Sequence, residues 1–171
     1  MNKGVSDELV LSLENVEATE RLGAVLADVL PEGVLVFLTG DLGTGKTTLV
    51  RGMLRALGYQ RAVKSPTYTL LEEYSLAGRE IIHFDLYRLT DPVELDLIGI
   101  RDYFNGKTCC FVEWPDRGRG YLPPEDLVIR ISHRASGREV RISAASDSGR
   151  EIIGSIQTGL CPESGCQTSP N

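Results

Sequence analysis

Hydrophobic positions along the chain repeat with two different periods, and these periods predict a mixture of strands and helices. Residues 8–13 alternate leucines with positions that can face water, which is typical of a half-buried strand. Apolar residues then recur at helical spacing over 22–29, and Pro31 and Gly33 end this predicted helix. The run VLVFLT at 34–39 is continuously apolar, so we predict a strand that is covered on both faces and lies at the centre of a sheet.

Further along the chain, the same periods predict a second helix, two hairpins, a short helix and another buried strand. The predicted segments are a helix at 49–57 stopped by Gly58, a hairpin of 67–76 with 79–84, a short helix capped by Asp91 and Glu94, a strand at 108–113, and a hairpin of 126–132 with 139–144. From residue 155 onward the residues are small and polar and no period is evident. We therefore expect one ordered domain over 1–154 and a disordered tail over 155–171.

Composition and charge narrow the class of protein. The chain has 171 residues, 42% of them hydrophobic, and 18 Lys and Arg against 24 Asp and Glu give a formal net charge of -6. An acidic balance argues against a protein that mainly wraps a nucleic-acid backbone, because neutralising phosphates requires a surplus of basic residues. The sequence has neither a long apolar run nor a basic start followed by an apolar stretch, so we expect no membrane span, no signal peptide and a cytoplasmic location.

The four cysteines do not indicate a metal site. Cys109 and Cys110 are neighbours on a predicted strand and so point to opposite faces, which favours two buried, free thiols. Cys161 and Cys166 lie in the polar tail without a nearby histidine, and we interpret them as free thiols rather than zinc ligands.

A glycine-rich loop supplies the first candidate chemistry. Residues 40–47 read GDLGTGKT and match G-x-x-x-x-G-K-[ST] between a predicted strand and a predicted helix. Such a loop turns its N–H groups inward to bind phosphate, and Lys46 would add a charge for the β and γ phosphates. The hydroxyl of Thr47 would bind Mg²⁺, whereas Thr48 either caps the helix or contacts a phosphate. The loop residues predicted to contact the nucleotide are Asp41, Gly43, Thr44, Gly45, Lys46 and Thr47.

The loop and the order of elements together predict an α/β fold. We expect a three-layer arrangement like that of the P-loop NTPases, with a central, mostly parallel sheet and antiparallel edge strands. Ligands in such sheets bind at the carboxyl ends of the strands. Asp85 and Glu113 each follow an apolar run and would therefore stand at this edge, as catalytic and metal-binding acids or, alternatively, as caps and ion-pair partners. Arg88 could pair with Asp85 or contact a phosphate.

Five segments in order resemble the TsaE family of bacterial P-loop ATPases. They are the loop GDLGTGKTT, KSPTYTL at 64–70, HFDLYRL at 83–89, DPVELDLIGIRDYF at 91–104 and VEWP at 112–115. The resemblance covers about residues 8–150, and five ordered motifs make it far more specific than the loop alone. It implies an ATP- and Mg²⁺-dependent protein required for the threonylcarbamoyl modification of adenosine in tRNA. The family works with the TsaB and TsaD proteins, so the resemblance implies that tRNA is reached through that complex.

The resemblance also implies roles for single residues. Lys46 and Thr47 would bind phosphate and Mg²⁺, Asp85 would be the Walker B acid, and Glu113 would bind the metal or activate water. Thr67 resembles a switch threonine that approaches the γ-phosphate, although a turn or capping role fits its sequence equally. Thr19 and Arg138 lie in segments that flank the nucleotide base in this family. Trp114, the only tryptophan, could stack near the nucleotide or on a partner, or simply pack.

Proteins of two other functional classes also contain such a glycine-rich loop, and both are alternatives for this chain. A small-molecule kinase is disfavoured because the sequence has no arginine-rich lid segment and no insertion long enough for an acceptor pocket. A nucleotide-gated binding module with negligible turnover remains open, since many such proteins hydrolyse nucleotide only when a partner completes the site. The N-K-x-D segment that recognises guanine is absent from the chain.

Overall fold

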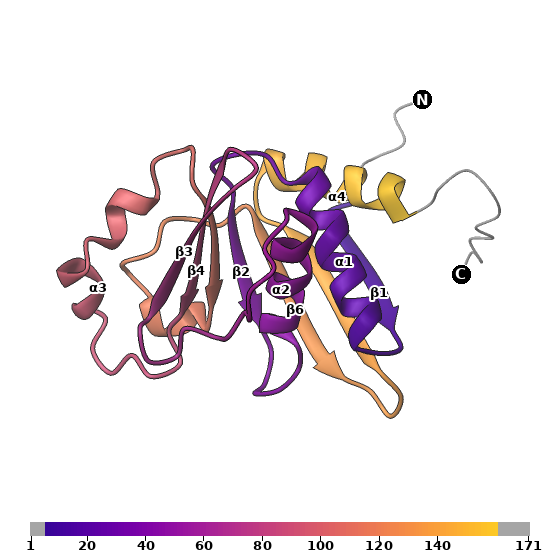
Figure 1. The fold of residues 1–171 in the computed structure, drawn as a ribbon, viewed down its shortest axis with the longest axis horizontal. Coiled ribbons are helices and arrows are strands. Elements are labelled where there is room, and N and C mark those ends of the chain that lie inside the picture. The colour runs from indigo at the N-terminus through magenta and orange to yellow at the C-terminus, as the bar shows by residue number, and fades with distance from the viewer. Residues whose placement is uncertain (1–5, 161–171) are drawn as a thin grey trace.

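The computed structural model describes residues 6–160, which form helices around a seven-stranded mixed sheet (Figure 1). The strands are β1 (Glu8–Leu13), β2 (Leu35–Thr39), β3 (Leu71–Leu76), β4 (Arg79–Asp85), β5 (Cys109–Glu113), β6 (Leu127–His133) and β7 (Arg138–Ala144). The helices are α1 (Val16–Val29), α2 (Lys46–Ala56), α3 (Glu94–Leu97) and α4 (Asp147–Leu160), with 3₁₀ turns at Ile100–Tyr103 and Pro115–Gly118.

The strand order is β1-β7-β6-β2-β5-β4-β3, so the continuously apolar β2 is the central strand, as predicted. Strands β6, β2, β5 and β4 run parallel, while β3 pairs antiparallel with β4 at one side and β7 and β1 pair antiparallel at the other. The predicted α/β class with antiparallel edges is therefore confirmed. Both predicted hairpins are present as β3–β4 and β6–β7.

Side chains of the buried strands alternate between two hydrophobic clusters, one on each face of the sheet. On β2, Val36 and Leu38 belong to the cluster that contains residues of α1, α2 and α4. Leu35 belongs to the cluster on the other face, which includes Leu95 of α3, and Phe37 packs against it. This arrangement gives three layers, with the sheet in the middle. It also means that Ile81, His83 and Asp85 of β4 all face α2.

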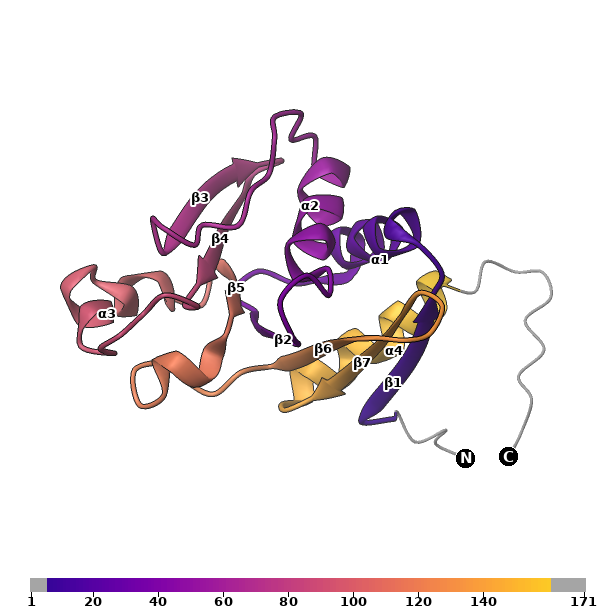
Figure 2. The same cartoon turned by 90° about the horizontal axis from the view of Figure 1, so that it is seen from below.

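Helices α1 and α2 lie side by side on one face of the sheet (Figure 2). A hydrogen bond from Ala18 N to the Asn15 side chain (2.8 Å) caps the start of α1. Glycines allow the close approach of the two helices, because a Cβ added at Gly52 would lie 2.3 Å from the carbonyl oxygen of Glu20. The packing fixes α2, and with it the loop that precedes this helix.

The short helix and the boundary of the tail differ in detail from the expectations. Asp91 and Glu94 do exchange hydrogen bonds, with Val93 N bonded to Asp91 Oδ1 and Asp91 N bonded to Glu94 Oε1, but α3 itself begins only at Glu94, so these bonds cap the turn before the helix. The expected boundary at residue 154 is wrong, because α4 continues to Leu160 and its Ile156 is fully buried. The remainder of the predicted tail, with Cys161 and Cys166, lies outside the described residues.

The described residues also bear on two other expectations. Cys109 and Cys110 are free and buried on opposite faces of β5, as predicted, and burial raises the pKa of each thiol to about 12. Among the helices of residues 6–160, none combines the length and the apolar character needed to cross a membrane.

Candidate functional site

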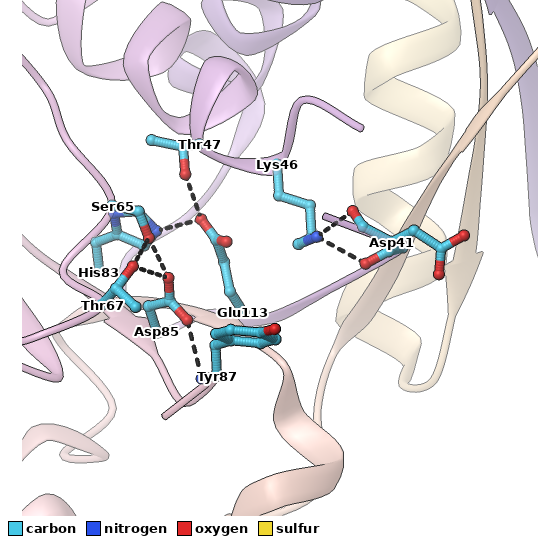
Figure 3. Close-up of polar contacts among 10 residues, drawn as sticks. Asp41, Lys46, Thr47, Ser65, Thr67, His83, Asp85, Tyr87 and Glu113 are labelled. Carbon is cyan, nitrogen blue, oxygen red and sulfur yellow. Dashed lines mark hydrogen bonds and ion pairs between the residues drawn. The ribbon is translucent and has the colours of Figure 1, made fainter. Parts of the chain in front are cut away.

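Polar side chains gather where β2, β4 and β5 end and α2 begins (Figure 3). Because β4 and β5 are parallel neighbours, their register places Asp85 directly beside Glu113. Asp85 is 3% exposed and Glu113 4% exposed, so both carboxylates lie at the inner end of the site. The sequence placed both acids at this edge, and the structure brings them together.

Glycines shape the loop between β2 and α2. Gly40, Gly43 and Gly45 all have positive φ angles, which side-chain-bearing residues rarely adopt. Gly40 is also tightly packed, because a Cβ there would lie 2.2 Å from the carbonyl oxygen of Ile131 in β6. A hydrogen bond also holds the loop, because the Thr44 hydroxyl donates to the Asp41 carbonyl oxygen (3.0 Å).

Lys46, the first residue of α2, directs its ammonium group back across this loop (Figure 3). Its Nζ donates to the carbonyl oxygens of Gly40 (2.7 Å) and Asp41 (2.8 Å) and lies 4.6 Å from the ring centroid of Trp114. Burial lowers the pKa of Lys46, and the nearby carboxylates, Glu113 foremost, oppose this shift. The loop therefore carries a partly desolvated positive charge between peptide carbonyls and an aromatic face.

Asp85 is held by three donors. Its Oδ2 accepts hydrogen bonds from the hydroxyls of Ser65 and Thr67, the latter at 3.1 Å, and its Oδ1 accepts from the backbone N–H of Tyr87 (3.0 Å). Ser65 and Thr67 come from the loop between α2 and β3. This loop is therefore tied to the end of β4 through a single carboxylate.

Glu113 connects α2 to β4. Its Oε1 accepts from the Thr47 hydroxyl (2.8 Å) and lies 2.9 Å from Nε2 of His83, a fully buried residue (Figure 3). Thr47 thus directs its proton to Glu113, which leaves the oxygen lone pairs of its hydroxyl available to another partner.

These groups surround a cavity of about 580 Å³. Its lining contains most of the residues that the sequence singled out and several that it did not. The lining residues are Leu42, Gly43, Gly45, Lys46, Thr47, Thr48, Ser65, Thr67, Asp85, Tyr87, Arg88, Glu113 and Trp114. One wall is the N-terminal end of α2, where free N–H groups and the helix dipole favour an anion.

The donor atoms of the cavity fit Mg²⁺ and phosphate. Thr47, Asp85 and Glu113 offer hydroxyl and carboxylate oxygens, which are the ligands that Mg²⁺ prefers, and Lys46 offers a cation for an anionic group. Within residues 6–160, no three His, Cys, Asp or Glu side chains lie close enough together to hold a metal by themselves. This is compatible with Mg²⁺, which usually keeps several waters and binds phosphate oxygens as well.

Four predicted contacts lie outside this cavity. Asp41 is exposed on the opposite side of the loop and Thr44 is buried beneath it. Thr19 and Arg138 lie together next to the loop, with Arg138 Nη1 3.4 Å from the Thr19 hydroxyl and Arg138 Nε 3.3 Å from the position of a Cβ on Gly45. The Nε of Arg138 is buried and has no hydrogen-bond partner among the described residues.

The structure bears on the alternatives for Arg88 and Trp114. Arg88 makes no ion pair with Asp85 within the described part of the chain; it lies 4.5 Å from the ring centroid of Tyr68 and lines the cavity. Trp114 also lines the cavity, with its ring 5.0 Å from that of Tyr87, so it faces the site as well as packing.

Three residues of the site, Ser65, His83 and Tyr87, were not predicted from the sequence. His83 could have been found from its place two residues before Asp85, because alternate residues of a strand point to the same face. Ser65 and Tyr87 reach Asp85 from loops, and loop geometry has no comparable periodic signal.

The fold and the cavity define a three-layer α/β protein with a glycine-rich loop and two carboxylates at the carboxyl edge of its central strands. Residues 13–141 match the family model described as threonylcarbamoyl adenosine biosynthesis protein TsaE. The chain therefore belongs to the TsaE family.

Individual relatives agree with this assignment. The chain is 49% identical over 138 residues to the tRNA threonylcarbamoyladenosine biosynthesis protein TsaE of Haemophilus influenzae, an alignment that covers 78% of this chain and 87% of that protein. It is 35% identical over 153 residues to the Bacillus subtilis protein of the same name, covering 87% and 89%. The crystal structure of Bacillus subtilis YdiB superposes with a TM-score of 0.78 at 28% identity, covering 90% of this chain and 97% of that one.

Proposed function

We propose that this chain serves the biosynthesis of threonylcarbamoyladenosine in tRNA by binding ATP with Mg²⁺ and hydrolysing it. Its membership of the TsaE family supports the pathway. One observation carries the proposed activity: a cationic side chain, a hydroxyl and two buried carboxylates from α2, β4 and β5 converge on a single cavity beside a glycine-rich loop. This is the set of groups that nucleotide hydrolysis requires.

The residues of the cavity divide into two sets. Lys46 and the N–H groups at the start of α2 would hold the phosphates, while Thr47 and Asp85 would hold Mg²⁺. Glu113, beside them, would bind the metal or activate water. Mg²⁺, when bound, would neutralise negative charge on the phosphate oxygens. Thr48 and Thr67 would contribute hydroxyls, and Thr19 with Arg138 would flank the base beside Gly45.

Glu113 is the group best placed to orient and deprotonate a water molecule. Its Oε1 is already bonded by Thr47 and contacted by His83, whereas no hydrogen bond to Oε2 is found among the described residues. A general base needs a free acceptor atom within hydrogen-bond reach of the proton it removes. Asp85, whose two oxygens accept three hydrogen bonds, is better suited to a fixed, metal-holding role.

We further propose that the chain acts with the TsaB and TsaD proteins in the cytoplasm, that ATP turnover resets their complex, and that tRNA is reached through those partners. The formal net charge of -6 supports this division, because an acidic chain is poorly suited to binding a phosphate backbone alone.

Lys46→Ala tests the nucleotide site. The change should weaken ATP binding at least about tenfold, since hydrogen bonds to charged groups contribute about 1.5–3 kcal/mol. Binding is measured by calorimetry and by the fluorescence of Trp114, the only tryptophan, which lines the cavity. Lys107→Ala is the matched control, because Lys107 is exposed and precedes β5 at the opposite edge of the sheet. Equal ATP affinities of the two variants would contradict the assignment.

Glu113→Gln tests hydrolysis. The variant should still bind ATP, but turnover should fall about 100-fold or more, as expected when a general base is lost. Turnover should be measured with the chain alone and with TsaB and TsaD. Phosphate release that requires a small acceptor molecule instead would indicate a kinase, and binding without turnover in both conditions would indicate a nucleotide-gated module.

A further inference from the structure

A buried histidine lies behind Glu113 and has no place in the function proposed so far. His83 belongs to β4, is 0% exposed, and points to the same face of the sheet as Asp85. Its Nε2 lies 2.9 Å from Glu113 Oε1, the oxygen that also accepts the Thr47 hydroxyl at 2.8 Å. His83 does not line the cavity, so it reaches the site only through Glu113.

Both contacts go to the same oxygen of the carboxylate. Within residues 6–160, Oε1 of Glu113 has two partners and Oε2 has none. Two partners on one oxygen fix the plane of the carboxylate and leave the other oxygen free to accept a proton or bind a cation. A single partner would leave the carboxylate free to rotate about its last bond.

The contact also fixes where the imidazole carries its proton. An ionised carboxylate can only accept hydrogen bonds, so Nε2 of His83 must carry the hydrogen. The other ring nitrogen, Nδ1, is buried and has no hydrogen-bond partner in the described part of the chain. A proton on Nε2 and none on Nδ1 satisfies this arrangement, because an unpaired acceptor at Nδ1 is less costly than an unpaired buried N–H.

We propose that His83 is a positioning residue, which donates its Nε2 proton to Oε1 of Glu113 and thereby holds Oε2 toward the reacting water. The contact itself does not depend on the proposed function, whereas its effect on turnover does. Mutation of an orienting partner of this kind commonly lowers activity or metal affinity by about 10- to 100-fold.

The tautomer tests the contact without any nucleotide. The chain has two histidines, and the second, His133, is exposed. Nitrogen-15 NMR of the imidazole rings should therefore show one buried ring with its proton on Nε2, and this signal should change in Glu113→Ala. A His83 ring with its proton on Nδ1 and none on Nε2 would overturn the proposal, because such a ring cannot donate to Glu113.

Substitutions test the effect on turnover. His83→Gln keeps a donor N–H at the reach of Nε2, whereas His83→Met fills a similar volume without a donor. We expect His83→Met to lower the kcat of ATP hydrolysis about 10- to 100-fold at nearly unchanged ATP affinity, and His83→Gln to restore most of the rate. Equal rates for the two variants, or a loss of affinity and stability without a change in kcat, would overturn the positioning role.

Double mutants distinguish an effect of His83 through Glu113 from a general loss of structure. If His83 acts through Glu113, His83→Gln and His83→Met should have equal rates in a Glu113→Gln background, because there is no longer a base to orient. Additive losses would contradict the proposal. Absence of turnover in the wild-type chain, with and without TsaB and TsaD, would refute the proposed ATPase. The position of the imidazole proton, measured by NMR, would still test the contact between His83 and Glu113.

Discussion

The last part of α4, residues 155–160, lies beyond the boundary that the sequence suggested, and Ile156→Ala tests whether it belongs to the folded domain. Ile156 is 0% exposed and packs in the same cluster as Leu22 and Leu26 of α1. The substitution removes three carbon atoms, which are worth about 2.4 kcal/mol at roughly 0.8 kcal/mol for each buried carbon. A cavity adds to this cost, and the better helix propensity of alanine offsets a few tenths of a kcal/mol. We therefore expect the free energy of unfolding to fall by about 2–4 kcal/mol.

Urea unfolding followed by far-ultraviolet circular dichroism measures this loss. The midpoint should decrease while the slope m stays constant, which indicates a change in stability rather than in the extent of unfolding. Gln157→Ala is the matched control, because Gln157 is the next residue of α4 and is exposed; its effect should stay within about 0.5 kcal/mol. A chain that ends at residue 154 should lose at least as much stability as Ile156→Ala.

Two results would refute this reasoning. If Ile156→Ala and Gln157→Ala unfold at the same urea concentration, Ile156 is not packed against α1 in solution. If the chain that ends at residue 154 is as stable as the full chain, residues 155–160 contribute nothing to the fold, and the boundary expected from the sequence is correct.

The other predictions concern packing and thiol chemistry. Gly52→Ala should destabilise the domain by about 1–3 kcal/mol in the same urea assay, because its Cβ would lie 2.3 Å from the carbonyl oxygen of Glu20 and force α1 away from α2; unchanged stability would contradict the close packing. The peptide that carries Cys109 and Cys110 should remain unalkylated by iodoacetamide in the native protein at pH 8 but react in guanidinium, as read by mass spectrometry. Burial raises the pKa of both thiols to about 12, and the thiolate is the reactive form, so rapid native labelling would contradict their burial.

The sequence predicted the centre of the fold because burial on both faces leaves an unambiguous pattern. The apolar runs at 34–39 and 108–113 became β2 and β5, which are paired in parallel. The parallel direction of β4 and β5 also placed Asp85 and Glu113 at one edge, since parallel strands end on the same side of a sheet. For these two acids, their positions directly after apolar runs and the direction of the strands were sufficient.

Residues 155–160 were mispredicted because α4 is a poor helix when considered alone. Its sequence contains three glycines, which disfavour a helix. Ile152, Ile153, Ile156 and Leu160 do recur at helical spacing, but the small and polar residues between and after them obscured this pattern. In proteins, most helical stability comes from packing an apolar face, and α4 packs against α1 and β1, which are far away in sequence, as well as against β7.

The internal hydrogen bonds of the site lay beyond sequence reasoning, because they depend on side-chain conformations from elements that are distant in the chain. The pattern assigned Lys46 to phosphate, yet its Nζ already donates to two loop carbonyls, at 2.7 and 2.8 Å. A phosphate that binds Lys46 would have to replace these bonds or share the ammonium group with them. The loss of ATP affinity in Lys46→Ala would therefore report how much more strongly Lys46 binds phosphate than the two loop carbonyls. It would not report the whole attraction between the ammonium group and the phosphate.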